Sequence, residues 1–225
     1  MPITTQERII FYTDKILNNA DKIVPFQEYN FYLFSELKGL VFEITNCIML
    51  DINQASICLT NHLLERTMKL SLIKYDMGKI KIGNPEFVNK IHSAYIKYDN
   101  LLLWETIKLA YEKEIINEGE QNLLKNLKGK YRNPFSHANS TKILPAKLVN
   151  ESFTGYKCNI EEGIKNLAEG KPIPIEEISI SSLTTVQEIQ NSFSDCNAFD
   201  YFKKVFDIMK SIDDRYKIKY NIKMP

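Results

Sequence analysis

The residues best suited to chemistry lie between Lys130 and His137, a segment that reads KYRNPFSH. Within it, Arg132 precedes His137 by just over one helical turn. Arginine offers a planar, permanently charged fork that can bind two phosphate oxygens at once. Histidine titrates near neutral pH and can accept or donate a proton there. This pair is therefore suited to binding a phosphate and moving a proton beside it.

Asn133 and Pro134 predict that a helix begins between these two residues. Asparagine is a strong N-cap, and proline fits the first helical position because its missing N–H is not needed there. Arg132 would then precede the cap and His137 would be the fourth helical residue, so their side chains could meet across the first turn. The free N–H groups of that helix end would favour an anion.

In RNA such a pair could cleave the chain without a metal. His137 would remove the proton of the 2′-hydroxyl, and Arg132 would stabilise the charge that develops on phosphorus. The four cysteines form no CxxC pair, and no histidine lies at metal-ligand spacing from them, so we expect neither a metal nor another cofactor. A simpler alternative stays open: Arg132 forms an ordinary salt bridge, and His137 is packed and inert.

The sequence RNPFSH at residues 132–137 resembles the R-x(4–6)-H motif of the HEPN superfamily (higher eukaryotes and prokaryotes nucleotide-binding domains). The resemblance covers about residues 28–145, and it includes the order of the helices before the motif. It implies an all-α bundle that acts as a metal-independent endoribonuclease, often a toxin or antiphage effector. Arg132 and His137 would be the catalytic pair, and Asn133 would assist. It also implies a homodimer with both motifs in one cleft, and an antitoxin or defence protein as a partner class.

Some HEPN proteins add an acidic residue from an earlier helix, and Glu65 is the candidate here. The alternative for Glu65 is an ion pair with Lys69, one helical turn away. Lys128, Lys130 and Tyr131 beside the motif are candidate substrate-binding residues, with the tyrosine stacking on a base. The alternative for the lysines is a solvated helix end, where cations are favourable in any case.

Apolar residues at spacings of three and four predict an all-α fold. We expect one domain over residues 1–225, with a core at about 28–145, a last helix at 198–215 and an irregular insert at 146–195. The insert would hold a short helix at 160–168 and one strand or extended arm within 173–180. The helices expected before the insert are 5–18, ahead of Pro25, and then 27–50, 52–75, 85–99, 101–117 and 120–131.

Composition limits the function classes. The 29 basic and 28 acidic residues leave a net charge of +1, which excludes a globally basic nucleic-acid binder but allows a local patch. No stretch of 18 apolar residues occurs, and the first residues do not resemble a secretion signal, so we expect a cytoplasmic protein with reduced cysteines and no membrane partner.

Two other function classes remain open. The same helix end could belong to a non-catalytic HEPN-like module that binds a nucleotide or a protein. The chain could also be an antitoxin-type or structural helical protein without a site. One feature departs from the HEPN pattern: Asn139, Ser140 and Pro145 predict an early end or a kink in the motif helix. The insert could be a lid, a dimer arm or a partner-binding surface.

Overall fold

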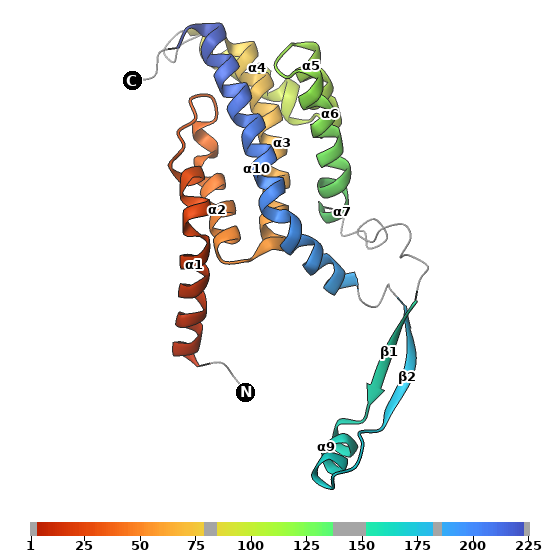
Figure 1. Ribbon diagram of the computed structural model, residues 1–225. Helices are drawn as coiled ribbons and strands as arrows, with labels where there is room; N and C mark the ends of the chain where they lie inside the picture. The colour runs from red at the N-terminus through yellow and green to blue at the C-terminus, as the bar shows by residue number, and fades with distance from the viewer. Residues whose placement is uncertain (1–3, 79–84, 137–151, 182–185, 223–225) are drawn as a thin grey trace. The chain divides into compact units, whose positions relative to one another are not determined.

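The computed structural model of the chain describes residues 4–78, 85–136, 152–181 and 186–222. The chain divides into two compact units, Met1–His137 with Phe193–Pro225, and Ala138–Ser192. The fold is all-α, as predicted, apart from a β-hairpin in the second unit (Figure 1). The predicted insert at 146–195 overlaps the second unit, but the last helix, predicted at 198–215, begins at Val186, so the end of the predicted insert is helical.

The first unit is a helical bundle around α3 and α10 (Figure 1). Tyr201 of α10 bonds to Asn61 of α3, and Tyr220 bonds to the carbonyl oxygen of Tyr75. These two helices also supply many of the buried side chains. The helices of the bundle are α1 (Thr5–Glu28), the 3₁₀ turn η1 (Ser35–Leu37), α2 (Lys38–Met49), α3 (Asn53–Met77), α4 (Pro85–Asp99), α5 (Leu103–Glu112), α6 (Glu118–Leu127), the π-helical turn η2 (Lys128–Arg132), α7 (Asn133–Ser136) and α10 (Val186–Tyr220).

Helix α1 is longer than predicted. Thr4, not Thr5, caps it through a capping box with Glu7, and the helix continues through Pro25 to Glu28. The expected break at Pro25 is wrong because packing holds the last turn in place. The Phe26 ring lies 5.0–5.8 Å from three rings of α10, which outweighs the lost backbone bond.

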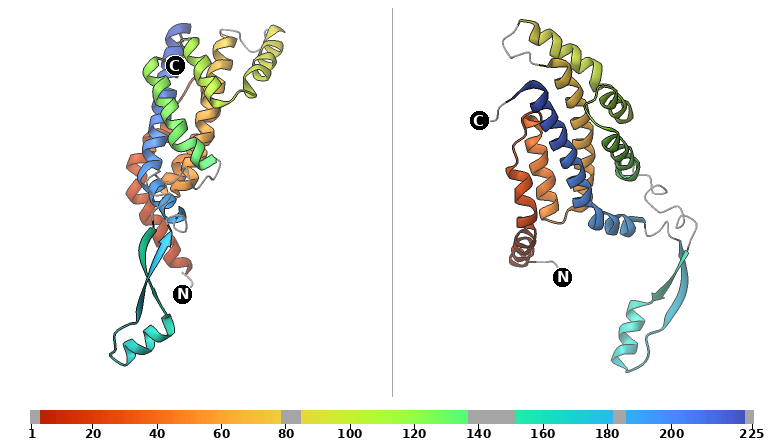
Figure 2. Two further views of the ribbon diagram at one scale, coloured as in Figure 1. Left: turned by 90° about the vertical axis from the view of Figure 1, so that its right-hand side faces the viewer. Right: turned by 45° about the horizontal axis from the view of Figure 1, so that its top comes forward.

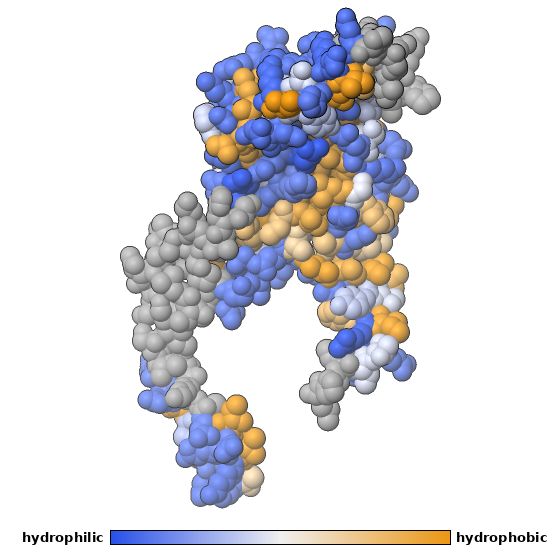
Figure 3. All heavy atoms as spheres, turned by 180° about the vertical axis from the view of Figure 1, so that it is seen from behind, coloured by the Kyte–Doolittle hydropathy of each residue, from blue (hydrophilic) through white to orange (hydrophobic). Residues whose placement is uncertain are grey.

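The N-terminal half of α1 carries exposed apolar side chains, among them Ile9, Ile10 and Leu17. Figure 3 shows apolar surface among polar residues on this part of the molecule. By contrast Ile23, near the other end of the helix, is buried. Only the C-terminal half of α1 therefore contributes to the core. Within the described ranges, no helix is long and apolar enough to span a membrane.

The helix predicted at 27–50 begins only at η1. The segment before η1 is not helical, because its backbone bonds to a side chain of α10. The buried Asp213 carboxylate accepts hydrogen bonds from the backbone N–H groups of Tyr32 and Leu33, at 3.3 and 2.5 Å. The helix predicted at 101–117 is also shorter than expected, and it ends at Glu112. Asn117 then caps α6, so Gly119 lies inside a helix and does not end one.

The second unit is a hairpin with a helix in its loop. Strand β1 (Ser152–Cys158) pairs antiparallel with β2 (Ile175–Ser181), and Gly155 lies opposite Ile178. Helix α9 (Ile160–Ala168) connects the strands, as Figure 2 shows. The short helix at 160–168 and an extended segment within 173–180 were both predicted. Strand β1 was not, because its short sequence with a central glycine gives little alternation.

Candidate functional site

Arg132 forms an ion pair with Glu65. The guanidinium Nε donates a 2.7 Å hydrogen bond to Glu65 Oε1, and the two side chains are 22% and 31% exposed. The pair joins η2 to α3, two elements far apart in the sequence. Lys69, the other candidate partner of Glu65, instead donates to the backbone oxygen of Asp99. The structure thus brings together two of the residues that the HEPN resemblance singles out.

A buried polar network lies beneath this pair. The Tyr201 hydroxyl donates a 2.8 Å hydrogen bond to Asn61 Oδ1, and Asn61 lies one turn before Glu65 on α3. Burial raises the pKa of Tyr201, the neighbouring Tyr131 and Glu65 raise it further, and Arg132 opposes them. Tyr201 therefore remains a neutral donor at physiological pH. It supports α3 beside Glu65 and is not a candidate acid or base.

Tyr131 belongs to the core. It is 1% exposed, and its ring stacks on that of Tyr201 with centroids 4.1 Å apart and planes 11° apart. Its hydroxyl bonds to Asn197 Oδ1 at 3.2 Å. The sequence suggested that the Tyr131 ring stacks on a base. This placement does not leave the ring free to do so. An aromatic residue beside basic ones gives no sign of which face is buried.

The predicted helix start at Asn133 is wrong. Residues 118–136 form one uninterrupted helical run, in which α6 passes through η2 into α7. Asn133 has helical backbone angles (φ −66°, ψ −46°), and its N–H donates to the Lys128 carbonyl, as in a π-helical turn. Arg132 therefore does not precede a helix N-terminus, and no free N–H groups of a helix start lie between Arg132 and Ser136.

The three cations in KGKYR do not converge on one point. The Lys130 ammonium bonds to Asn197 Oδ1 at 3.1 Å and lies over the rings of Tyr131 and Phe193. Lys128 lines a cleft between α5 and α6. Arg132 is directed at Glu65 of α3. Close spacing in the sequence does not produce a single basic patch here.

The candidate His137 lies outside the described residues, which stop at Ser136 on this side and resume at Ser152. The early end predicted from Asn139, Ser140 and Pro145 falls in the same range. Asn133, the candidate assisting residue, is half-buried in α7 directly after Arg132. The geometry of the site is therefore described for Arg132, Glu65 and Asn133.

The remaining histidines lie elsewhere on the bundle. His62 is exposed, and it lines a cleft with Arg66 and Tyr95. His92 is exposed on α4. Among the described residues, no three His, Cys, Asp or Glu side chains group closely enough to hold a metal ion.

Two features of the site were not predicted. The sequence offered no signal for the Asn61–Tyr201 bond, because the two residues lie on helices far apart in the chain. Trp104, which lies in an apolar run of the sequence, is 50% exposed. It lines the same cleft as Lys128.

Comparison with protein families, curated proteins and solved structures gives no match to the chain. The resemblance to HEPN proteins therefore rests on the sequence motif and the helix order alone.

Proposed function

We propose that this protein is a metal-independent endoribonuclease of HEPN type. The observation that carries the proposal is the Arg132–Glu65 pair, in which a part-exposed guanidinium of the motif is held by a carboxylate from an earlier helix. Some HEPN proteins add an acidic residue from an earlier helix, and Glu65 is the candidate for that residue here. The all-α fold is also compatible with the proposal.

In the proposed reaction His137 removes the proton of a ribose 2′-hydroxyl. The resulting alkoxide attacks the adjacent phosphorus, the bond to the 5′-oxygen breaks, and that oxygen leaves with a proton. The products are a 2′,3′-cyclic phosphate and a 5′-hydroxyl. Arg132 stabilises the added negative charge on the phosphorane, and Glu65 orients Arg132 through Nε. Asn133 would assist by hydrogen bonding to the RNA backbone.

The proposal includes a homodimer, since two motifs facing one cleft would provide a second set of cations for the substrate. The near-zero net charge makes a concentrated site of this kind necessary, because the chain has no overall electrostatic attraction for RNA. A toxin or defence role in the cytoplasm, with an antitoxin or defence protein as its partner, belongs to the same proposal.

The deciding experiment is RNA cleavage by the purified protein with and without EDTA. We expect cleavage in both conditions and 2′,3′-cyclic phosphate ends on the products. His137→Ala should abolish the activity while the circular dichroism spectrum and Tm stay unchanged. His92→Ala, the same change at an exposed position on α4, is the matched control. Full activity of His137→Ala would refute the proposed mechanism.

A second function, binding without cleavage, is favoured by one feature of the same pair. The Glu65 carboxylate already offsets part of the charge of the Arg132 guanidinium, which weakens the stabilisation that Arg132 could give to the dianionic phosphorane. A non-catalytic HEPN-like module would bind a nucleotide or a protein through this surface. Binding of several RNAs without any cleavage product would establish that function in place of the ribonuclease.

A further inference from the structure

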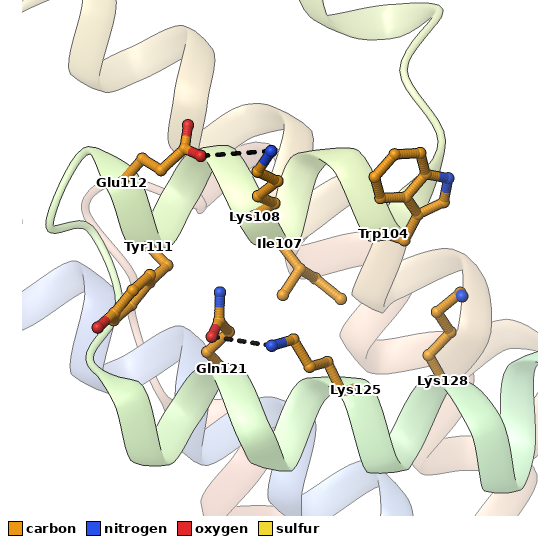
Figure 4. A pocket seen from close by; sticks show the side chains of 8 residues that line it. All are labelled: Trp104, Ile107, Lys108, Tyr111, Glu112, Gln121, Lys125 and Lys128. Atoms are coloured by element: carbon orange, nitrogen blue, oxygen red, sulfur yellow. Dashed lines mark hydrogen bonds and ion pairs between the residues drawn. The ribbon is translucent and has the colours of Figure 1, made fainter.

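A cleft of about 490 Å³ lies between α5 and α6. Trp104, Lys108 and Tyr111 follow one another at one-turn spacing on α5 and form one stripe. Gln121 and Lys125 of α6 and Lys128, the first residue of η2, form the facing stripe, and Figure 4 shows these three side chains and Ile107 projecting into the space between the helices, with Trp104 beside it. This volume lies within the range of small-ligand sites, roughly 300–1,000 Å³.

The cleft combines exposed rings with cations. Trp104 is 50% exposed and Tyr111 is 41% exposed, so solvent reaches part of both residues. Ile107 lies between them and is buried, giving the cleft an apolar floor. A flat aromatic ligand is well suited to stack on such a ring, because aromatic rings favour offset-stacked contacts.

The charges of the cleft favour an anion. Lys108, Lys125 and Lys128 line it, and of the carboxylates in the described part of the chain only Glu112 does. Glu112 pairs with Lys108 at 3.7 Å, while Lys125 bonds to the neutral Gln121 at 3.0 Å. Among the described residues, neither Lys125 nor Lys128 has a carboxylate partner. The two ammonium groups, one on α6 and one at the start of η2, therefore have no described carboxylate paired with them.

We propose that this cleft binds an unpaired nucleobase together with its attached phosphate. The base would stack on Trp104, and the phosphate would contact Lys128, which lies opposite Trp104 at one end of the cleft (Figure 4). Lys125 would contact the next phosphate of a strand. The proposal does not depend on Arg132 and His137 being catalytic, because it uses other residues and a different helix pair.

The chain contains one tryptophan, so tryptophan fluorescence reports on this cleft alone. We would titrate the full chain, at low salt, with an eight-residue oligouridylate, uridine monophosphate, an RNA duplex and inorganic polyphosphate. Single-stranded RNA should quench Trp104, and the duplex and polyphosphate should not. Quenching by uridine monophosphate with similar affinity would identify the ligand as a free nucleotide. Quenching by the oligomer alone would identify it as single-stranded nucleic acid.

Substitutions test which groups carry the binding, measured with a fluorescently labelled oligomer. Trp104→Leu should weaken binding roughly tenfold, in line with the loss of one base–aromatic stack. Lys125→Glu with Lys128→Glu should weaken it at least about tenfold and flatten the salt dependence, which is about −0.7 per phosphate contact on a single strand. Lys90→Glu, at an exposed position on α4, is the charge control and should leave binding unchanged.

Two results would overturn the proposal. One is binding of oligouridylate without any change in Trp104 fluorescence. The other is binding that Trp104→Leu leaves intact and that polyphosphate matches, because the cleft would then attract anions without recognising a base. Cleavage of RNA is measured separately. If RNA still quenches Trp104 normally in an inactive His137→Ala variant, base binding in the cleft is independent of catalysis.

Discussion

Arg132 Nε lies 2.7 Å from Glu65 Oε1, and this bond joins residues that are 67 positions apart in the chain. Both side chains keep some contact with solvent, so the pair contributes little stability. In a double-mutant cycle with Glu65→Gln and Arg132→Gln, we expect a coupling free energy of about 0.5–1 kcal/mol. Urea unfolding of the four proteins measures it. A coupling near zero would show that the bond does not persist in solution.

The chemistry of Arg132 can be tested apart from its charge. Arg132→Lys keeps a cation but removes the planar fork that matches phosphate. If the protein is a ribonuclease, we expect kcat to fall on the order of 10²-fold, as when one transition-state donor is removed. Glu65→Gln should reduce kcat less, because it only loosens the orientation of the arginine. Single-turnover cleavage of RNA measures both. A larger loss in Glu65→Gln than in Arg132→Lys would contradict these roles.

The Tyr201–Asn61 bond should contribute measurably to stability. Tyr201→Phe keeps the stack on Tyr131 but leaves the buried Asn61 oxygen without this donor. We expect a loss of about 1–2 kcal/mol in the free energy of unfolding. Tyr131→Phe should cost less, since its hydroxyl bond is longer and only partly buried. Tyr12→Phe, on the exposed part of α1, is the control. Equal losses for all three variants would argue against the network.

Acid should weaken the bundle at Asp76, which connects α3 to α4 and to the end of α5. Its carboxylate accepts from Tyr98, Lys97 and Lys113 at 2.5, 3.2 and 2.8 Å. Burial alone would raise the pKa of Asp76, but these hydrogen bonds outweigh it and hold the pKa below its ordinary value of 3.8. The contribution to stability is therefore present above this ordinary value and is lost as the pH falls through the lowered pKa.

Asp76→Asn should lower stability at neutral pH by about 1–2 kcal/mol and remove part of the decline below about pH 4. Thermal unfolding from about pH 3 to pH 7 measures both effects. Asp14→Asn, at an exposed position of α1, should leave the curve unchanged. Parallel curves for wild type and Asp76→Asn across this range would refute the assignment.

Gly78 ends α3 in a backbone conformation that suits glycine alone (φ 59°, ψ −132°). A Cβ there would meet only the Tyr220 ring at ordinary contact distance, so the cost of Gly78→Ala is backbone strain. We expect a loss of about 1–3 kcal/mol. Gly39→Ala, in α2 with open space around it, should instead stabilise by up to about 1 kcal/mol. Chemical denaturation compares the two, and similar losses for both would contradict this explanation.

Helical periodicity was enough to predict the fold class and the positions of most helices. The 85–99 and 160–168 helices have the predicted bounds because proline and asparagine signals agree with the apolar pattern there. Local signals failed where packing opposed them. The ring contact of Phe26 with α10 stabilises the helical turn after Pro25. The hydrogen bond that Asp213 accepts from the Leu33 N–H keeps the following segment out of the next helix. No local pattern contains such long-range contacts.

The candidate site was predicted in part for the same reason. The motif indicated Arg132, and the resemblance indicated Glu65. In the structure Arg132 Nε lies 2.7 Å from Glu65 Oε1. Tyr131 was assigned to the wrong environment, because an aromatic side chain fits a core or a surface equally well by composition. The helix start was misread because Asn-Pro is a start signal only where the preceding chain is not already helical.

The π-helical turn at Lys128–Arg132 has a consequence for how this site can vary. Pro134 has no N–H to bond to the Lys130 carbonyl, so regular winding is already disfavoured there. One residue more or less in a turn rotates the rest of the helix by about 100° around its axis. A change that restored regular winding, at Gly129 or Pro134, would therefore re-aim Arg132 without altering Arg132 or Glu65. The direction of the Arg132 side chain could therefore change in evolution through the winding of this helix, while Arg132 itself is kept.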